Sequence, residues 1–228
     1  MTLIWPILFL NMNNVVTIDQ GVIEYKVEME MSDSNLIDNQ DFVLALLEEL
    51  EMKVYFNKDE IRTDMALEEI YQLKSFINRS NGESIMYMDF FGRRIKTKPQ
   101  NIPAFDTDIQ ATISEDLTKT KSIAGLTAHE MTISWPNDEG RPSITTFVSD
   151  QLAFEFIGFG MEDYAALKKV PLEYTLINDQ FKLRIFATKF SPEIKASVFK
   201  KPAGYETKEL DEIGGLLSNS PFLKSFGN

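Results

Sequence analysis

Hydrophobic and polar residues alternate along much of the chain, which is the pattern of β-strands that have one buried and one solvated face. The clearest case is the segment 21–31 (GVIEYKVEMEM), where Tyr25 and Met29 fall on the apolar side and the glutamates fall on the other. The segment 126–135 (LTAHEMTISW) alternates in the same way. Both segments are therefore predicted to be strands that bury one face in a hydrophobic core.

Polar turns join further predicted strands into hairpins. Two pairs are predicted across turns that contain Asn and Asp, namely 52–56 with 61–65, and 172–177 with 181–190. Other strands are predicted at 84–90, 93–98, 109–113 and 143–148. Turn signals recur about every ten residues, which favours one antiparallel sheet, a sandwich or an open barrel.

A few segments show the spacing of an amphipathic helix instead. In the segment 42–50, Phe42, Leu46 and Leu50 recur every four positions, which predicts a helix with one apolar stripe. Shorter helical pieces are predicted at 161–169, 206–217 and 221–226. The segment 66–76 fits either a helix or a strand.

The N-terminal residues 3–10 (LIWPILFL) form an uninterrupted apolar run. The run is shorter than the roughly 20 residues that cross a bilayer, and it fits the hydrophobic part of a secretion signal. However, the first basic residue is Lys26 and no cleavage site is clear; the alternative is an edge strand that contains Pro6. The predicted division is thus 1–20 as a residual signal segment or edge strand, and 21–228 as a single domain.

Composition narrows the function classes. The formal net charge is −12, which disfavours binding to nucleic acid and electrostatic docking to anionic lipids. The chain has no cysteine, which excludes disulfides, thiolate metal sites and a cysteine nucleophile. Its 17 Phe and 10 Met residues fit either an ordinary core or an adaptable apolar ligand cavity.

The sequence shows no recognisable catalytic, cofactor or metal motif. His129 is the sole histidine and is followed by Glu130, but Ile133 stands where a zinc-protease motif needs its second histidine. Because it lies in an alternating segment, His129 is predicted to be a surface or half-buried side chain. The polar stretch 33–41 lacks the glycine and glutamate of a calcium loop. The protein is therefore predicted not to be an enzyme, with no catalytic residue, cofactor or metal ligand.

Five segments, in order, resemble a GLPGLI-like family of unknown function from the cell envelope of Bacteroidetes, whose members resemble LolA-type lipoprotein carriers in fold. The segments are 21–25 (GVIEY), 85–95 (IMYMDFFGRRI), 118–125 (TKTKSIAG), 170–174 (VPLEY) and 198–205 (VFKKPAGY). The chain departs from the family pattern at Leu126, Ala128 and Lys169. Within these segments, Gly125 and Gly204 are predicted at sharp turns, where a side chain would clash.

The resemblance implies an α+β, mainly β fold, in which a strongly curved antiparallel sheet (a LolA-like half-barrel) wraps around one or more helices. It also implies a periplasmic or outer-membrane-associated protein whose concave face binds an apolar ligand, namely an acyl chain or a lipoprotein. The alternative is a structural or protein-interaction domain with a filled core. The predicted ligand-cavity residues are Tyr25, Met29, Phe42, Leu46, Leu50, Tyr87 and Phe186.

Overall fold

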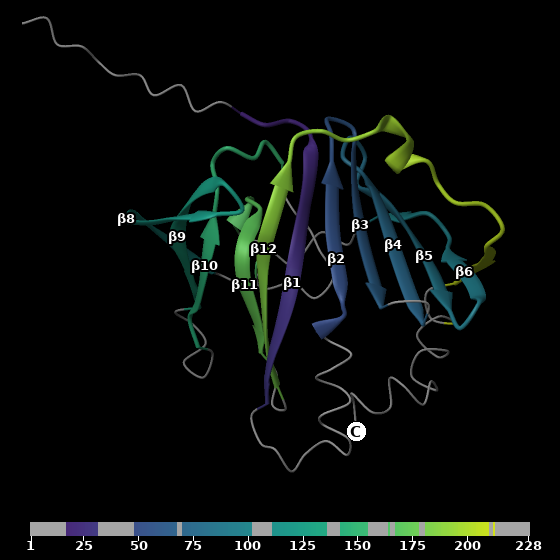
Figure 1. The fold of residues 1–228 in the computed structure, drawn as a ribbon, viewed down its shortest axis with the longest axis horizontal. Coiled ribbons are helices and arrows are strands. Elements are labelled where there is room, and N and C mark those ends of the chain that lie inside the picture. The colour runs from purple at the N-terminus through teal and green to yellow at the C-terminus, as the bar shows by residue number, and fades with distance from the viewer. Residues whose placement is uncertain are drawn as a thin grey trace, which may run out of the picture.

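A computed structural model shows that the chain is built on one curved sheet (Figure 1). The structure describes residues 17–31, 48–67, 70–101, 111–135, 142–154, 164, 167–177, 181–209 and 212. The strands in these ranges form a 13-stranded sheet in the order β13-β6-β5-β4-β3-β2-β1-β12-β11-β10-β9-β8, with β7 paired to β5. Every pairing is antiparallel except that of β13 with β6.

The strand bounds follow the chain. In the first half they are β1 (Gly21–Met31), β2 (Glu51–Phe56), β3 (Glu60–Leu67), β4 (Tyr71–Asn78), β5 (Glu83–Phe90), β6 (Arg93–Thr97) and β7 (Gln100–Asn101). In the second half they are β8 (Thr112–Ile123), β9 (Leu126–Ser134), β10 (Ile144–Val148), β11 (Pro171–Ile177), β12 (Phe181–Ser191) and β13 (Glu206–Lys208). A single turn of 3₁₀ helix covers Ala196–Phe199.

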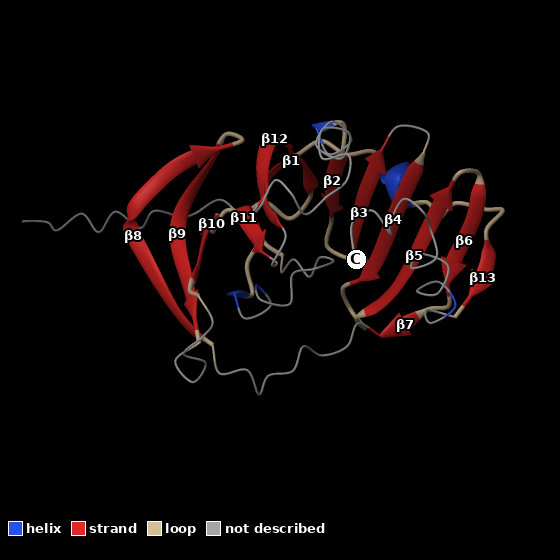
Figure 2. Ribbon diagram, turned by 90° about the horizontal axis from the view of Figure 1, so that it is seen from below, coloured by secondary structure: helices blue, strands red, loops and turns tan. Residues whose placement is uncertain are grey.

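The sheet bends so that its two ends, β8 and β13, turn toward the same side (Figure 2). We call the concave side the inner face; β1 places Ile23, Tyr25 and Val27 on it, all buried. The opposite, outer face carries Glu24 and Lys26 of the same strand. The alternation along β1 therefore separates core from solvent as predicted, and the large curved antiparallel sheet is confirmed.

Tight turns explain why neighbouring strands form hairpins. Between β2 and β3, the side chain of Asn57 accepts hydrogen bonds from the backbone N–H groups of Asp59 (2.8 Å) and Glu60 (2.7 Å). Between β8 and β9, Ala124 (φ 52°) and Gly125 (φ 83°) are both left-handed, which matches the twist of the strands they join. Gly125 therefore lies in a tight turn, as predicted, but a Cβ there would meet no surrounding atom within 4 Å, so its left-handed φ and not a clash is what favours glycine.

The main core lies under the inner face of β1, β2 and β9–β12. Tyr174 is at its centre, and its ring packs edge-on against Tyr25 (6.3 Å between centroids) and Tyr164 (5.5 Å). The segment that follows β10 crosses the inner face, where Phe154 stacks on Phe56 of β2 at 4.0 Å. Strands far apart in the sheet are thereby joined through one packed cluster of side chains.

A strap formed by residues 192–205 crosses the outer face between β12 and β13. The guanidinium of Arg62 on β3 donates a hydrogen bond to the carbonyl oxygen of Val198 in this strap. At its end, Gly204 has a φ of 82° and the ring of Tyr205 packs edge-on against Tyr87 of β5, 5.2 Å away. The strap therefore covers the outer face of β3–β5, and Gly204 lies in a left-handed conformation at a turn, as predicted.

Several predicted elements differ from the structure or lie outside it. The predicted helix at 206–217 is wrong at its start, because residues 206–208 form β13 and pair in parallel with β6. The ambiguous segment 66–76 ends in a strand, β4, and β8 extends well beyond the predicted 109–113. These three outcomes have one cause: pairing with a neighbouring strand outweighs local propensity.

The predicted helices that the sheet would wrap are not seen in the described ranges. Phe42 and Leu46, with the rest of 42–47, lie outside these ranges, as do 221–226 and most of 161–169. No α-helix has both of its ends among the residues that the structure describes, although Glu48 and Glu212 are each in α-helical conformation. Among the same residues, no helix has the length and apolar character needed to cross a membrane.

Candidate functional site

The predicted ligand-cavity residues do not gather in one place. Tyr25 is buried in the main core, where its hydroxyl donates a hydrogen bond to the carbonyl oxygen of Pro171 at 3.0 Å. Burial raises its pKa well above the usual value for tyrosine. Met29 lies on the same face of β1 as Tyr25, where it pairs with Leu183, and Leu50 packs against the main core. Tyr25 is therefore a structural residue with a satisfied hydroxyl group.

Two other predicted cavity residues lie on the outer face. Met88 pairs with Leu73 on the inner face. Tyr87 is the preceding residue of the same strand, so the ring of Tyr87 points to the outer face, where it packs against Phe76. Phe186 pairs with Lys26, and its ring lies 4.7 Å from the guanidinium carbon of Arg184. A one-residue difference in position selects the opposite face of a strand. Neither side chain can therefore line a cavity on the inner face.

The outer face of β1 and β12 is instead a ladder of ion pairs. Across these two strands, Glu24 pairs with Lys189, Glu28 with Arg184, and Glu30 with Lys182, at 2.8, 3.0 and 2.9 Å. These side chains are largely solvated, so each pair contributes at most about 1 kcal/mol to stability. The charges make this part of the outer face unsuited to an apolar ligand.

A second cluster of buried apolar residues lies on the inner face of β3–β6 and meets the main core at Met65. We call it the methionine cluster; it consists of buried Leu73, Met88 and Ile95 with partly buried Met65, Tyr71 and Met86. Strand register places all six on one face, since Met65 pairs with Leu73 and Leu73 with Met88. Burial raises the pKa of Tyr71 to about 12.

Apolar surface continues from the methionine cluster into the turn between β5 and β6. The ring of Phe90 lies 6.4 Å from that of Tyr71, and the ring of Phe91 lies 4.7 Å from that of Phe90. Phe91 is 69% exposed and has a φ of 48°. A left-handed turn position favours Asn, Asp or Gly. Local turn stability therefore does not explain a phenylalanine here.

A polar cluster lies at the other end of the sheet, around the sole histidine. We call it the acid–histidine cluster; it consists of Glu115, His129, Asp150 and Lys169. His129 is only 5% exposed, so the prediction of a surface or half-buried side chain is wrong. Its strand lies between β8 and β10, and His129 pairs with Thr120 and with Val148, so neighbouring strands flank the imidazole on both sides.

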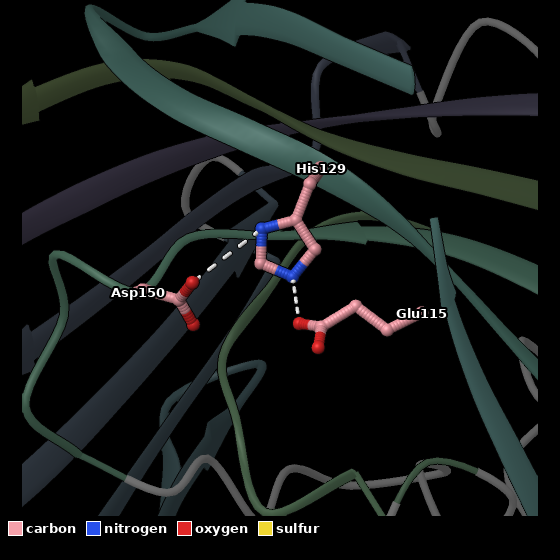
Figure 3. Close-up of side chains that lie close together, drawn as sticks. All are labelled: Glu115, His129 and Asp150. Carbon is pink, nitrogen blue, oxygen red and sulfur yellow. Dashed lines mark ion pairs between the residues drawn. The ribbon is translucent and has the colours of Figure 1, made fainter. Parts of the chain in front are cut away.

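The geometry of the acid–histidine cluster is asymmetric around the imidazole ring (Figure 3). Nε2 of His129 lies 2.6 Å from Oε1 of Glu115, and Nδ1 lies 3.7 Å from Oδ2 of Asp150. Although the first contact is short, it lacks hydrogen-bond geometry, and Nε2 is buried without a hydrogen-bond partner. Lys169 Nζ lies 3.0 Å from Oε1 of Glu115 and 2.7 Å from Oδ1 of Asp150.

Irregular backbone brings these four side chains together. Glu115 pairs with Met131, two residues from His129 on β9, and the register of β8 shifts between Asp116 and Thr120. Such a bulge re-aims the side chains beside it. Lys169 follows Lys168, which has a left-handed φ of 50° just before β11. The four residues come from separate parts of the chain, so sequence spacing gave no signal of the cluster.

Charge in the acid–histidine cluster is shared between two carboxylates and one ammonium. The hydrogen bond from Lys169 holds the pKa of Glu115 below its usual value, against the opposing effect of burial. Burial alone would lower the pKa of Lys169, but its hydrogen bonds to Asp150 and Glu115 outweigh burial and raise it. Near neutral pH these three groups therefore carry a net charge of about −1, before the imidazole is counted.

Comparisons with known proteins give a fold likeness and no family. No protein-family model matches the sequence, and no curated protein matches it either. Among solved structures, PNGF-II matches with a TM-score of 0.50 and 12% identity, over 88% of this chain and 34% of that one. The chain thus spans about a third of the length of PNGF-II, and at this identity the match shows a similar fold alone.

A weaker structural match is a LolA superfamily protein from Nitrosomonas europaea. Its TM-score is 0.24 and its identity 7%, over 82% of this chain and 93% of that chain. A similarity of this size carries no argument about function. Membership of the GLPGLI-like envelope family and the LolA-like fold remain predictions, and the demonstrated fold is a mainly β, curved, open antiparallel sheet.

Proposed function

We propose that this protein is a non-enzymatic binding module of the periplasm or outer membrane, which holds an acyl chain against the inner face of β3–β6. The observation that carries the proposal is the methionine cluster, whose three buried residues are distinct from those of the main core and which has partly buried methionines at its margin. Thioether side chains are flexible and polarisable, so they adapt to an apolar ligand. A ligand that covered them would gain about 25 cal/mol for each Å² of apolar surface removed from water.

The other surfaces of the sheet are less suited to an acyl chain, because they carry charges or are already covered by other parts of the protein. The outer face of β1 and β12 carries the ion-pair ladder, and the strap covers the outer face of β3–β5. In the main core, large rings fill the space: Tyr25 packs against Tyr174, and Phe56 stacks on Phe154. The methionine cluster and its extension through Phe91 are therefore the better place for an acyl chain.

Lipid extraction and binding test the proposal together. Mass spectrometry of an organic extract of the purified protein is expected to find acyl lipids, and the delipidated protein is expected to take up a fluorescent fatty acid. Met86→Gln places an amide at the margin of the cluster and should weaken uptake at least about fivefold, a loss of about 1 kcal/mol. Ile85→Gln is the matched control, because Ile85 is also partly buried but faces outward on the same strand.

The outcomes separate the proposal from its alternative. Equal binding by the wild type and both variants would mean that the fatty acid binds elsewhere. Absence of both extracted lipid and uptake would favour a structural or protein-interaction domain with a filled core. The close ring contacts of the main core are the observation that favours this second function.

A further inference from the structure

We propose that Glu115, His129 and Asp150 bind a divalent transition-metal ion, for which Zn²⁺ is the best-matched probe. The proposal concerns the opposite end of the sheet from the methionine cluster and is independent of lipid binding. Each of the three residues offers one ligand atom, and these atoms lie within 4.8 Å of one another. One imidazole nitrogen and two carboxylate oxygens form a donor set that zinc accepts, with a further position open to water.

The buried imidazole is the first argument for a cation. Nε2 of His129 faces Oε1 of Glu115 at 2.6 Å without hydrogen-bond geometry and has no other partner. Nε2 and a carboxylate oxygen therefore face each other around a buried imidazole without a hydrogen bond between them. A metal ion placed there would accept a lone pair from each of the two atoms. A buried polar atom without a partner otherwise costs about 1–3 kcal/mol.

Lys169 is the second argument, because its ammonium already marks the position of a cation. Nζ bridges Oε1 of Glu115 and Oδ1 of Asp150, at 3.0 and 2.7 Å. The side chain of Lys169 is 31% exposed, so it has a route into solvent. A dication in its place balances the charge of two carboxylates, which one ammonium does not. The ammonium of Lys169 would therefore compete with a metal ion for the two carboxylates.

Zinc binding requires that the donor atoms of the three side chains can move closer together. Zinc–oxygen and zinc–nitrogen bonds are about 2.0–2.2 Å, so the donor atoms must approach to within about 3.5 Å of one another. The side chains of Glu115 and Asp150 are 38% and 48% exposed and can change rotamer, whereas the imidazole is held by its burial. The other oxygen of Asp150, Oδ2, lies on the Nδ1 side of the ring, where it can orient the imidazole.

The test is titration of the untagged, metal-free full chain with ZnCl₂ in a calorimeter. We expect one site per chain in the wild type, and at least about tenfold weaker binding in Glu115→Gln and His129→Gln. Lys169→Met removes the competing charge and should strengthen binding. Glu130→Gln is the matched control; Glu130 is next to His129 on β9 and pairs with Lys119, outside the cluster. Its affinity for Zn²⁺ should equal that of the wild type.

Three results would overturn the metal site. The first is no binding by either the wild type or Lys169→Met up to about 1 mM Zn²⁺. The second is equal affinity in the wild type and Glu115→Gln, which would show adventitious binding elsewhere. The third is Ca²⁺ binding as strong as Zn²⁺ binding, because an imidazole ligand selects against calcium. If circular dichroism shows that His129→Gln does not fold, Glu115→Gln still tests the metal site, because Glu115 is partly exposed.

Discussion

The two apolar regions of the inner face are built from the same alternating strands but from different side chains. The main core uses aromatic rings such as Tyr174 and Phe56, which are fully or almost fully buried and pack against Tyr25 and Phe154, respectively. In the methionine cluster, three buried side chains are bordered by partly buried Met65 and Met86. Rigid rings fill the space under one half of the sheet, whereas flexible side chains leave an adaptable surface under the other half. The difference separates the part of the sheet that stabilises the fold from the part proposed to bind.

The largest expected effect is on stability, from truncation in the main core. Phe56→Ala should lower the free energy of unfolding by about 3–5 kcal/mol, because a buried ring stacked on Phe154 leaves a cavity that its neighbours cannot fill. Urea unfolding followed by circular dichroism measures the change. A loss below about 1 kcal/mol would show that the main core is loosely packed, which would contradict the proposed difference between the main core and the methionine cluster.

Truncation in the methionine cluster should cost less. Met88→Ala is expected to lower the free energy of unfolding by about 2 kcal/mol, the lower end of the range for buried methionine. The reason is that the flexible side chains of Met65 and Met86 can move into the space. The same urea experiment checks this value. A loss as large as that of Phe56→Ala would mean that the two regions are equally rigid.

Alkaline pH offers a further comparison, through Tyr71 in the methionine cluster. Burial raises its pKa from 10.0 in the unfolded chain to about 12. Because the folded pKa is the higher one, the contribution to stability is fully present below pH 10 and is lost as pH rises through about 12. The loss is on the order of 2–3 kcal/mol. Unfolding of Tyr71→Phe should accordingly be less pH-dependent than that of the wild type in this range; identical pH profiles would show that Tyr71 is solvated.

The smallest stability effect is expected at the exposed turn between β5 and β6. Phe91→Asn should change the free energy of unfolding by less than about 0.5 kcal/mol, or increase it slightly, since asparagine suits a left-handed φ of 48°. If Phe91 belongs to the binding surface, fatty-acid affinity should nevertheless fall. Unchanged affinity for the fluorescent fatty acid would remove Phe91 from that surface.

The sequence was informative where alternation alone determines the structure. Segment 21–31 was predicted as a strand with Tyr25 on its buried side, and the structure shows this strand as β1. Gly125 and Gly204 were predicted at turns because their conformations are local. Such features depend on a few neighbouring residues, so they can be read from the chain directly.

What depends on distant pairing was not predictable in the same way. Phe186 was chosen for its apolar ring, but its register with Lys26 directs the ring to the outer face. Residues 206–208 form β13 because the strap places them beside β6, although their own sequence predicts a helix. The contact of His129 with Glu115 depends on the register of β8 with β9 and on the irregular pairing of β8 between Asp116 and Thr120. A single sequence carries no signal for any of these contacts.

Photolabelling with a diazirine-bearing fatty acid tests the central claim most directly, because it locates the bound acyl chain. After irradiation and proteolysis, label is predicted in peptides that contain Met65, Met86 and Phe91, and Met86→Gln should reduce the labelling. Label confined to peptides of the ion-pair ladder or of β8–β12, or no specific label at saturating fatty acid, would contradict binding at the methionine cluster.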